Sequence, residues 1–504
     1  MALDCSLGSM GILNDLFDGS CEQAVECDIT LPDYCPDIAR VLKCTVTPAV
    51  VSSKISGDRA CADGSVCVRL VYCGEDSGIY SYEHECPFSK YAELGGEKNG
   101  SLITDIKTEY VNCRAISGRR AEIRAMLHIS FKITALSKRN IITSVERQGV
   151  QTQKCALDIS DIVACECKQF TVNETVELPA DYLPADRIIS VCATPILNDT
   201  KIVKDKILIK GEAAVTVIYF SNGSGCETSK YCYSLLISQI VDMPGIDENC
   251  SADVTLKTVG VQCVGRNDAQ SEIRLLDIAV CIEACVKAYA QSQLECITDA
   301  YCIDGELSAD YEPVDFYKSV DRFSDTFTSK CPVDFSSLDA QSIAAMWFDE
   351  PTVHKKIANS HIRISGTAPF NAITLDSDGK PSFCSREIDF EYSRKIDAPD
   401  DAVCTPCMSL NAYSVGQLND SKAEIKAEFG VCAQVFERKT ARVLVSADVT
   451  ERENERRHSS AMIVYFPDED EKMWDIARKF NTTVELIEAE NGSNSSGALL
   501  IPVI

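Results

Sequence analysis

The sequence predicts a mainly β protein, in which three tandem β-sandwich or barrel-like repeat domains precede a small βααβ domain. Three observations predict this fold class. A set of landmark residues recurs three times along the chain. Between the landmarks, apolar residues alternate with a period of two. After residue 459 the apolar spacing becomes helical.

Composition restricts the classes of function. The chain has 504 residues, and its 76 acidic and 49 basic side chains give a formal net charge of −27. An apolar fraction of 45% is ordinary for a folded soluble protein, so the chain is not an acidic disordered tail. At about 150 residues per domain, the length corresponds to three or four domains. Phosphate backbones repel such a charge, so we expect no nucleic-acid partner.

The repeat is visible in landmark residues at matched spacing. A proline is followed 16, 16 and 15 residues later by a glycine, at Pro48 and Gly64, Pro195 and Gly211, and Pro351 and Gly366. A Glu-Ile pair follows at Glu122-Ile123, Glu272-Ile273 and Glu424-Ile425. Units of about 150 residues can bury their own cores, which predicts tandem domains and not a solenoid.

Apolar alternation within a unit predicts strands. Val66, Val68, Leu70 and Tyr72 occupy every second position, as do the apolar residues from Ile123 to Ile129. Several such runs separated by turn residues are typical of a sandwich or barrel. We expect an amino-terminal segment at 1–20, β domains at 21–155, 156–312 and 313–458, and the small domain at 460–504.

The first two units share a proline-bounded signature. Leu31-Pro-Asp-Tyr-Cys-Pro36 returns as Leu178-Pro-Ala-Asp-Tyr-Leu-Pro184, whereas the third unit has Cys331-Pro-Val-Asp334. Two prolines exclude helix, and Asp and Tyr can close a turn on the backbone. The signature therefore predicts either a structural corner or a binding surface.

Cysteine is abundant, with 27 residues, but its spacing is not that of a zinc site. Only Cys404 and Cys407 form a Cys-x-x-Cys, and the five histidines show no ligand-like clustering. Many cysteines occupy strand positions that suit a small apolar residue, so we expect buried reduced thiols. Later cross-linking and metal binding are the alternatives; we expect no metal and no cofactor.

The carboxyl-terminal residues predict a βααβ order. Strands are expected at Met462 to Phe466 and Leu499 to Val503, and an acidic turn at Asp468 to Glu471. Helical spacing of Met473, Trp474, Ile476, Ala477 and Phe480 predicts one helix. Thr482 with Glu485 predicts a capping box for a second helix, which Asn491-Gly492 ends.

These residues resemble a LysM domain, a small fold that binds N-acetylglucosamine polymers. The match covers Asp470 to Ala477, Thr482 to Leu486, Asn491-Gly492 and Leu499 to Pro502. Where sugar-binding members have glycine and threonine, this chain has Asp470 and Lys472, within an acidic cluster that disfavours a neutral glycan. The cluster is alternatively a solvated helix start, and Trp474 is either core or contact.

The whole architecture resembles the SipL family of clostridial spore-coat morphogenetic proteins, with tandem SPOCS-type domains before a LysM domain. The resemblance implies a mother-cell cytoplasmic scaffold at the forespore surface. Its LysM domain would bind the coat ATPase SpoIVA, with other coat proteins as further partners. We place the contact at Asp470, Met473, Trp474, Asn491 and Gly492. The alternative is binding of peptidoglycan in the cell wall or cortex.

Two further classes are not expected. Residues 1–20 have no basic region followed by an apolar stretch, and the chain has no run of 18 apolar residues, so neither a secretion signal nor a membrane span is expected. We found no Gly-x-Ser-x-Gly, phosphate-binding glycine loop or His-Glu-x-x-His motif, so no catalytic residues and no enzymatic activity are expected.

Overall fold

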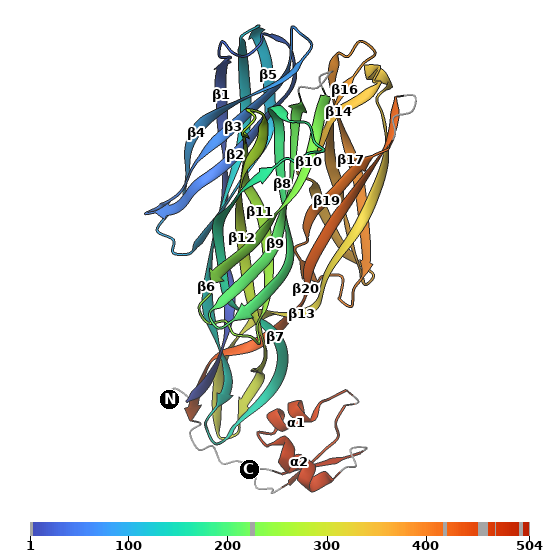
Figure 1. Cartoon of the computed structure of the whole chain (residues 1–504). Coiled ribbons are helices and arrows are strands. Elements are labelled where there is room, and N and C mark those ends of the chain that lie inside the picture. The colour runs from blue at the N-terminus through green and yellow to red at the C-terminus, as the bar shows by residue number, and fades with distance from the viewer. Residues whose placement is uncertain are drawn as a thin grey trace.

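The computed structural model describes residues 4–221, 227–416, 421–451, 462–468, 470–492 and 497–502. It is mainly β, as predicted. Three units of the same design, which we call unit 1 (residues 5–145), unit 2 (150–302) and unit 3 (305–451), each pack two antiparallel sheets face to face (Figure 1). A small module with the only two α-helices among the described residues follows them.

In each unit, one layer contains the first, last and fifth strands, and the other contains the second, third and fourth. In unit 2 a single pair, Ile273 with Ala185, links the two layers into one six-stranded sheet. In unit 1 these are β1 (Cys5–Thr30), β6 (Arg120–Val145) and β5 (Ser101–Ser117), facing β2 (Ile38–Ser56), β3 (Arg59–Gly74) and β4 (Ile79–Glu93). In unit 2 they are β7 (Val150–Glu177), β12 (Ile273–Cys302) and β11 (Ser251–Asn267), facing β8 (Ala185–Val203), β9 (Lys206–Ser221) and β10 (Glu227–Asp242).

Unit 3 repeats this arrangement with divided strands. Its first sheet holds β13 (Gly305–Asp334), β20 (Lys422–Glu451), β18 (Val403–Cys404) and β19 (Cys407–Val415). Its second holds β14 (Ser342–Phe348), β15 (Thr352–Ala358), β16 (His361–Leu375) and β17 (Pro381–Lys395). The landmark residue Pro351 lies in the break between β14 and β15, the two halves of the second strand.

The predicted alternation is confirmed in the cores of the units. On β3, Val66, Val68, Leu70 and Tyr72 are fully buried between the two sheets. The landmark glycines are explained by a close approach of two backbones. A Cβ at Gly64, Gly211 or Gly366 would collide with the carbonyl oxygen of the residue that follows the landmark proline, which is Ala49, Ile196 or Thr352. Only glycine fits a third strand at this point.

The predicted equivalence of the Glu-Ile pair in unit 2 with the pair in unit 1 is wrong. Leu31 N donates to Arg119 O and Leu178 N donates to Arg274 O, both at 2.8 Å, so these two bonds are equivalent. The counterpart of Ile123, four residues beyond Arg119, is therefore Ile278 and not Ile273. The match at Glu272-Ile273 came from a short dipeptide that recurs by chance.

The proline-bounded signature forms a structural corner. The Tyr72 hydroxyl donates to Pro36 O, and the Tyr219 hydroxyl donates to Leu183 O, both at 3.1 Å. Arginine side chains hold the same corners, because Arg119 donates to Pro32 O and Arg274 donates to Tyr182 O. Unit 3 has Thr374 where the other units have this tyrosine. Its corner is instead filled by the fully buried Phe335 and a 3-10 turn, Ser336–Leu338.

The cysteines adopt several states. Cys27, Cys296 and Cys384 are buried, as expected of small apolar residues, while Cys232 is exposed. Cys167 and Cys285 form a disulfide between β7 and β12, which the expectation of reduced thiols did not include.

Beyond the sandwiches, the first and last strands of each unit continue as a two-stranded ribbon, and the three ribbons pack together as a stem (Figure 1). Met10, Ile159, Leu294, Phe316 and Val443 belong to the shared apolar core of the stem. From Cys5, the residues expected to form a separate segment at 1–20 belong to β1. The units meet at residues 146–149 and 303–304, a few residues before the expected boundaries.

The three sandwiches also close into a ring. The fourth strand of each unit contacts the second strand of the next. In this way Ser81 of β4 donates to Ile188 O of β8 at 2.8 Å, and Thr228 of β10 donates to Ala344 O of β14. The third contact closes the ring, because Arg40 of β2 donates to Pro381 O of β17. Apolar residues from all three units meet at its centre, including Val71, Ile218 and Trp347.

Candidate partner-docking module

The carboxyl-terminal module has the predicted βααβ order. It contains β21 (Met462–Tyr465), α1 (Met473–Lys479), α2 (Val484–Asn491) and β22 (Leu499–Pro502), and the two strands pair antiparallel. The predicted positions 460–461, 469 and 503 lie outside the described residues. The cap of α2 is one residue later than expected, because the Thr483 hydroxyl accepts from Leu486 N at 3.1 Å while Thr482 is fully buried.

The module packs on the end of the stem and shares its core with unit 2. Tyr301 and Ile303, at and just beyond the end of β12, belong to the same apolar cluster as Ile476, Ile487 and Ile501 of the module. The Tyr301 hydroxyl donates to Thr482 O at 2.7 Å. The module is therefore fixed to the stem through a buried aromatic contact.

Trp474 belongs to this contact. Its ring meets the Tyr301 ring edge-on, with centroids 4.9 Å apart, and its Nε1 donates to an Asp299 carboxylate oxygen at 2.7 Å. Arg478 forms an ion pair with the same carboxylate at 2.9 Å. The structure thus places Trp474 against the stem, within the same polypeptide chain.

The other residues expected at the contact divide into structural and exposed groups. The Asn491 side chain donates to Ile487 O and Leu500 O and accepts from Leu500 N, which joins α2 to β22. Gly492 ends α2 with a φ of 63°. Met473 packs against the module core, and Asp470 is exposed. Whether these residues contact a partner stays a prediction.

A different surface of the module is apolar and exposed. Met462, Val464 and Phe466 point outward from the β21 segment, and Leu500 faces the same way on β22, because Val464 and Leu500 are paired. Phe466 is 74% exposed and Val464 is 59% exposed. We call these four residues the strand face. The alternation with inward Ile463 and Tyr465 is present in the sequence, where the segment was interpreted only as an apolar strand.

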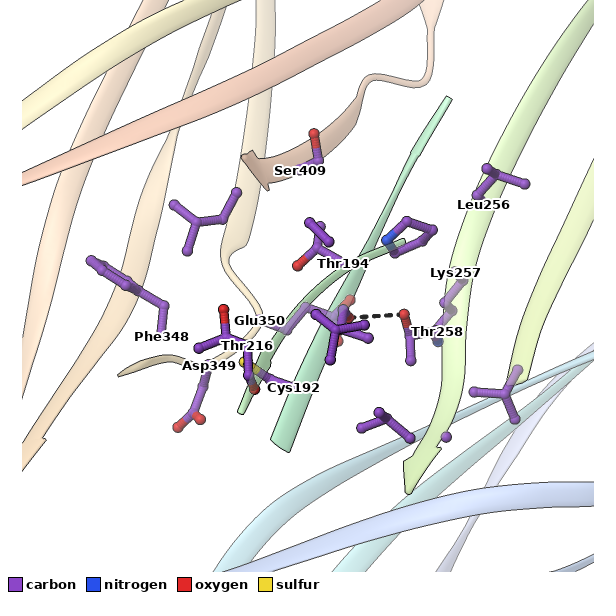
Figure 2. A pocket seen from close by; sticks show the side chains of 18 of the residues that line it. Cys192, Thr194, Thr216, Leu256, Lys257, Thr258, Phe348, Asp349, Glu350 and Ser409 are labelled. Atoms are coloured by element: carbon purple, nitrogen blue, oxygen red, sulfur yellow. Dashed lines mark hydrogen bonds between the residues drawn. The ribbon is translucent and has the colours of Figure 1, made fainter. Parts of the chain in front are cut away.

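A large cavity lies between the three units (Figure 2). It has a volume of about 2810 Å³ and is lined by side chains such as Cys192, Lys257 and Asp349. Lys257 pairs with Asp105 of unit 1, so this cation joins two units. Burial raises the pKa of the Cys192 thiol to about 11, which keeps it protonated at neutral pH. The described lining residues include no histidine that could act as its base.

Comparison with known families finds a similarity in two of the three units. Residues 37–116 and 184–264 match the family model described as SipL, SPOCS domain. The same domain model thus matches two successive segments of the chain. The two matches extend over β2 to β5 of unit 1 and β8 to β11 of unit 2, which are the strands between the corner and the last strand of each of these units. No curated protein and no solved structure matches the chain.

Among the described residues, neither helix is long or apolar enough to cross a membrane.

Proposed function

We propose that this protein is a non-enzymatic scaffold of the spore coat. It acts in the mother-cell cytoplasm, at the forespore surface, where its carboxyl-terminal module docks onto the coat ATPase SpoIVA and ties other coat proteins to it. The tandem SPOCS domains support the assignment to the SipL type of protein. The resemblance of residues 470–502 to LysM supports the docking role of the module.

The observation that carries the docking proposal is the exposed strand face. The opposite side of the same two-stranded sheet, with Ile463 and Leu499, is in the core that the module shares with the stem. The strand face therefore points away from the stem, where a partner can reach it. Burying an exposed valine or phenylalanine contributes about 1.5–3 kcal/mol for each side chain, so a few such residues can anchor an interface.

The body of the protein supports a scaffold in a second way. The ring of sandwiches and the packed stem hold the module at a fixed distance from the far end of the three units (Figure 1). Such a body presents one contact at one end and leaves the surfaces of three domains for others. The negative net charge favours basic partners and repels copies of itself.

Capture of SpoIVA by variants of the full chain tests the docking surface. Replacing both Val464 and Phe466 by aspartate places charges in the interface and should lower capture at least about tenfold, the effect of roughly 1.4 kcal/mol. Leu236→Asp is the matched control, since Leu236 is 79% exposed on β10 and far along the chain from the module. Deleting residues 460–504 should abolish capture. Equal capture by the double aspartate variant and the control would overturn the docking surface.

Binding of peptidoglycan is the alternative function, favoured by the same LysM resemblance. Asp468 and Asp470 are exposed beside the start of α1. Recognition of a neutral sugar gains little from exposed carboxylates at this place. Sedimentation with purified peptidoglycan separates the two functions. The proposed scaffold stays in the supernatant, whereas a glycan-binding protein is recovered in the pellet.

A further inference from the structure

One edge of the unit 1 sandwich brings together three side chains that are far apart in the sequence. Cys27 lies on β1, and His84 and Cys86 lie on β4, the first and fourth strands of the unit. Residues 84 and 86 share the inner face of β4 because side chains on a strand alternate. One ligand atom from each of the three residues lies within 4.8 Å of the other two.

The same edge carries a polar contact between the sheets in the other two units. The corner bonds align Leu31 with Leu178, so Cys27 corresponds to Glu174, four residues before Leu178. The third strands align through Gly64, paired with Phe88, and Gly211, paired with Ile237, so His84 corresponds to Tyr233. The Tyr233 hydroxyl donates to the Glu174 carboxylate at 2.9 Å.

In unit 3 the first and fourth strands are also joined by polar side chains, a few residues farther along the strands. Arg394 of β17 forms an ion pair with Asp325 of β13 at 2.6 Å, and the Tyr392 hydroxyl donates to the same carboxylate. The first and fourth strands are therefore joined by a hydrogen bond in unit 2, and by an ion pair and a hydrogen bond in unit 3. Unit 1 replaces them with two thiols and an imidazole.

We propose that Cys27, His84 and Cys86 bind a zinc ion that joins β1 to β4. Two cysteine sulfurs and one histidine nitrogen are the soft and borderline donors that tetrahedral Zn²⁺ prefers, and water completes the fourth position. The carboxylates that would favour Mg²⁺ or Ca²⁺ do not belong to this group among the described residues. The ion takes the place of the hydrogen bond in unit 2 and the ion pair in unit 3.

Proton release accompanies binding. Burial, together with a hydrogen bond to Cys86, raises the pKa of the Cys27 thiol to about 12, so this thiol carries a proton before the ion arrives. Zinc binds the thiolate form of cysteine, so the Cys27 proton passes to the solvent when the ion binds. The apparent affinity therefore falls as the pH is lowered.

The opposite edge of the same sandwich provides a matched control. Cys44 of β2 and Cys113 of β5 are joined by a hydrogen bond between their side chains, but this pair belongs to no group of three ligands among the described residues. If any pair of neighbouring thiols binds zinc, both edges will bind it. If the histidine is needed, only the first edge will.

The experiment uses the full chain, purified with reductant and stripped of metal by a chelator. Titration with Co²⁺ reports tetrahedral thiolate coordination by visible absorption, and competition with Zn²⁺ gives the zinc affinity. The wild-type chain should bind one tight equivalent. His84→Ala and Cys86→Ser should each weaken binding more than about 100-fold, beyond the usual loss for an outer-shell partner. Cys113→Ser should retain the tight equivalent.

Two results would overturn the site. One is that His84→Ala binds as tightly as the wild-type chain, and the other is that Cys113→Ser weakens binding as much as His84→Ala does. His84 is only half-buried near the sheet edge, so its replacement should leave the fold intact. Circular dichroism of each stripped variant checks this, and a rise in melting temperature on adding Zn²⁺ should occur in the wild-type chain and in Cys113→Ser alone.

Discussion

Asp299 of β12 holds the carboxyl-terminal module through two side chains at once. Trp474 donates its ring N–H to this carboxylate, and Arg478 pairs with it. Asp299→Ala leaves the indole N–H without its partner, at a cost of about 1–3 kcal/mol. We expect faster hydrogen exchange in α1 and α2, measured by mass spectrometry, with the units unchanged.

The control for this variant is Asp310→Ala on the same stem. Asp310 accepts a hydrogen bond from Ser446 of the adjacent strand and does not belong to the contacts of the module described above. If exchange in the module is the same in the two variants, Asp299 does not hold it. Arg478→Gln should give a smaller effect than Asp299→Ala, since it removes a half-exposed ion pair and leaves the indole bond.

At the scale of single residues, the sequence located the right module but not the roles of its side chains. Trp474 was predicted as core or contact because its helix position was visible. Its partner Asp299 lies 175 residues earlier in the chain, and no local pattern joins them. The strand face was missed for the opposite reason, since an apolar alternation does not say which face a neighbour covers. His84 and Cys27 likewise meet only through the pairing of two sheets.

Among the elements, the third strand of each unit is fixed by its landmark glycine. Gly211→Ala on β9 would push a methyl group into Ile196 O, and overpacking of this kind costs about 1–3 kcal/mol. We expect a clear loss of stability in urea denaturation. The control is Gly260→Ala on β11, where a methyl group meets no atom within 4 Å, so stability should be unchanged or slightly higher. Equal losses for both variants would contradict the close-approach explanation.

The contacts of Asp325 on β13 with Arg394 and Tyr392 on β17 predict that the stability of the protein depends on pH. Hydrogen bonds from Tyr392 and then Arg394 lower the pKa of this carboxyl below its ordinary value of 3.8. A lowered pKa in the folded state adds stability above pH 3.8, and this stability is lost as the pH falls through the folded pKa. Asp325→Asn should therefore melt at a lower temperature than the wild-type chain at neutral pH.

The difference between the two melting temperatures should shrink as the pH is lowered below about 4, because the wild-type carboxyl is then protonated as well. A difference that stays constant down to about pH 2 would show that the charge of Asp325 contributes nothing.

The sequence predicted the strands of the sandwiches better than those of the stem. Inside the sandwiches, one buried face gives a clean alternation, as on β3. In the first part of β1, Gly8, Gly11 and Asn14 have low strand propensity, and residues 1–20 were expected only to form an amino-terminal segment. Pairing with β6 makes residues 5–20 a strand, and that pairing is with residues 130–145.

For the whole molecule, the ring of sandwiches predicts the behaviour of a shortened chain. Ending the chain at residue 304 removes unit 3 and the carboxyl-terminal module, and exposes the apolar surfaces of units 1 and 2 that meet Trp347 and Phe316. We expect this shortened chain to self-associate in analytical ultracentrifugation while the full chain does not, with circular dichroism confirming that strands remain. A folded and monomeric product would contradict the importance of the third contact.

Closure of the ring uses up the contacts between neighbouring units. Repeated head-to-tail contacts propagate into a filament unless the rotation between copies returns to its starting point, and here it returns after three copies encoded in one gene product. No repeat contact is left over to recruit another molecule. The three units therefore form a closed set within one polypeptide, and the contact between units does not by itself extend from one molecule to the next.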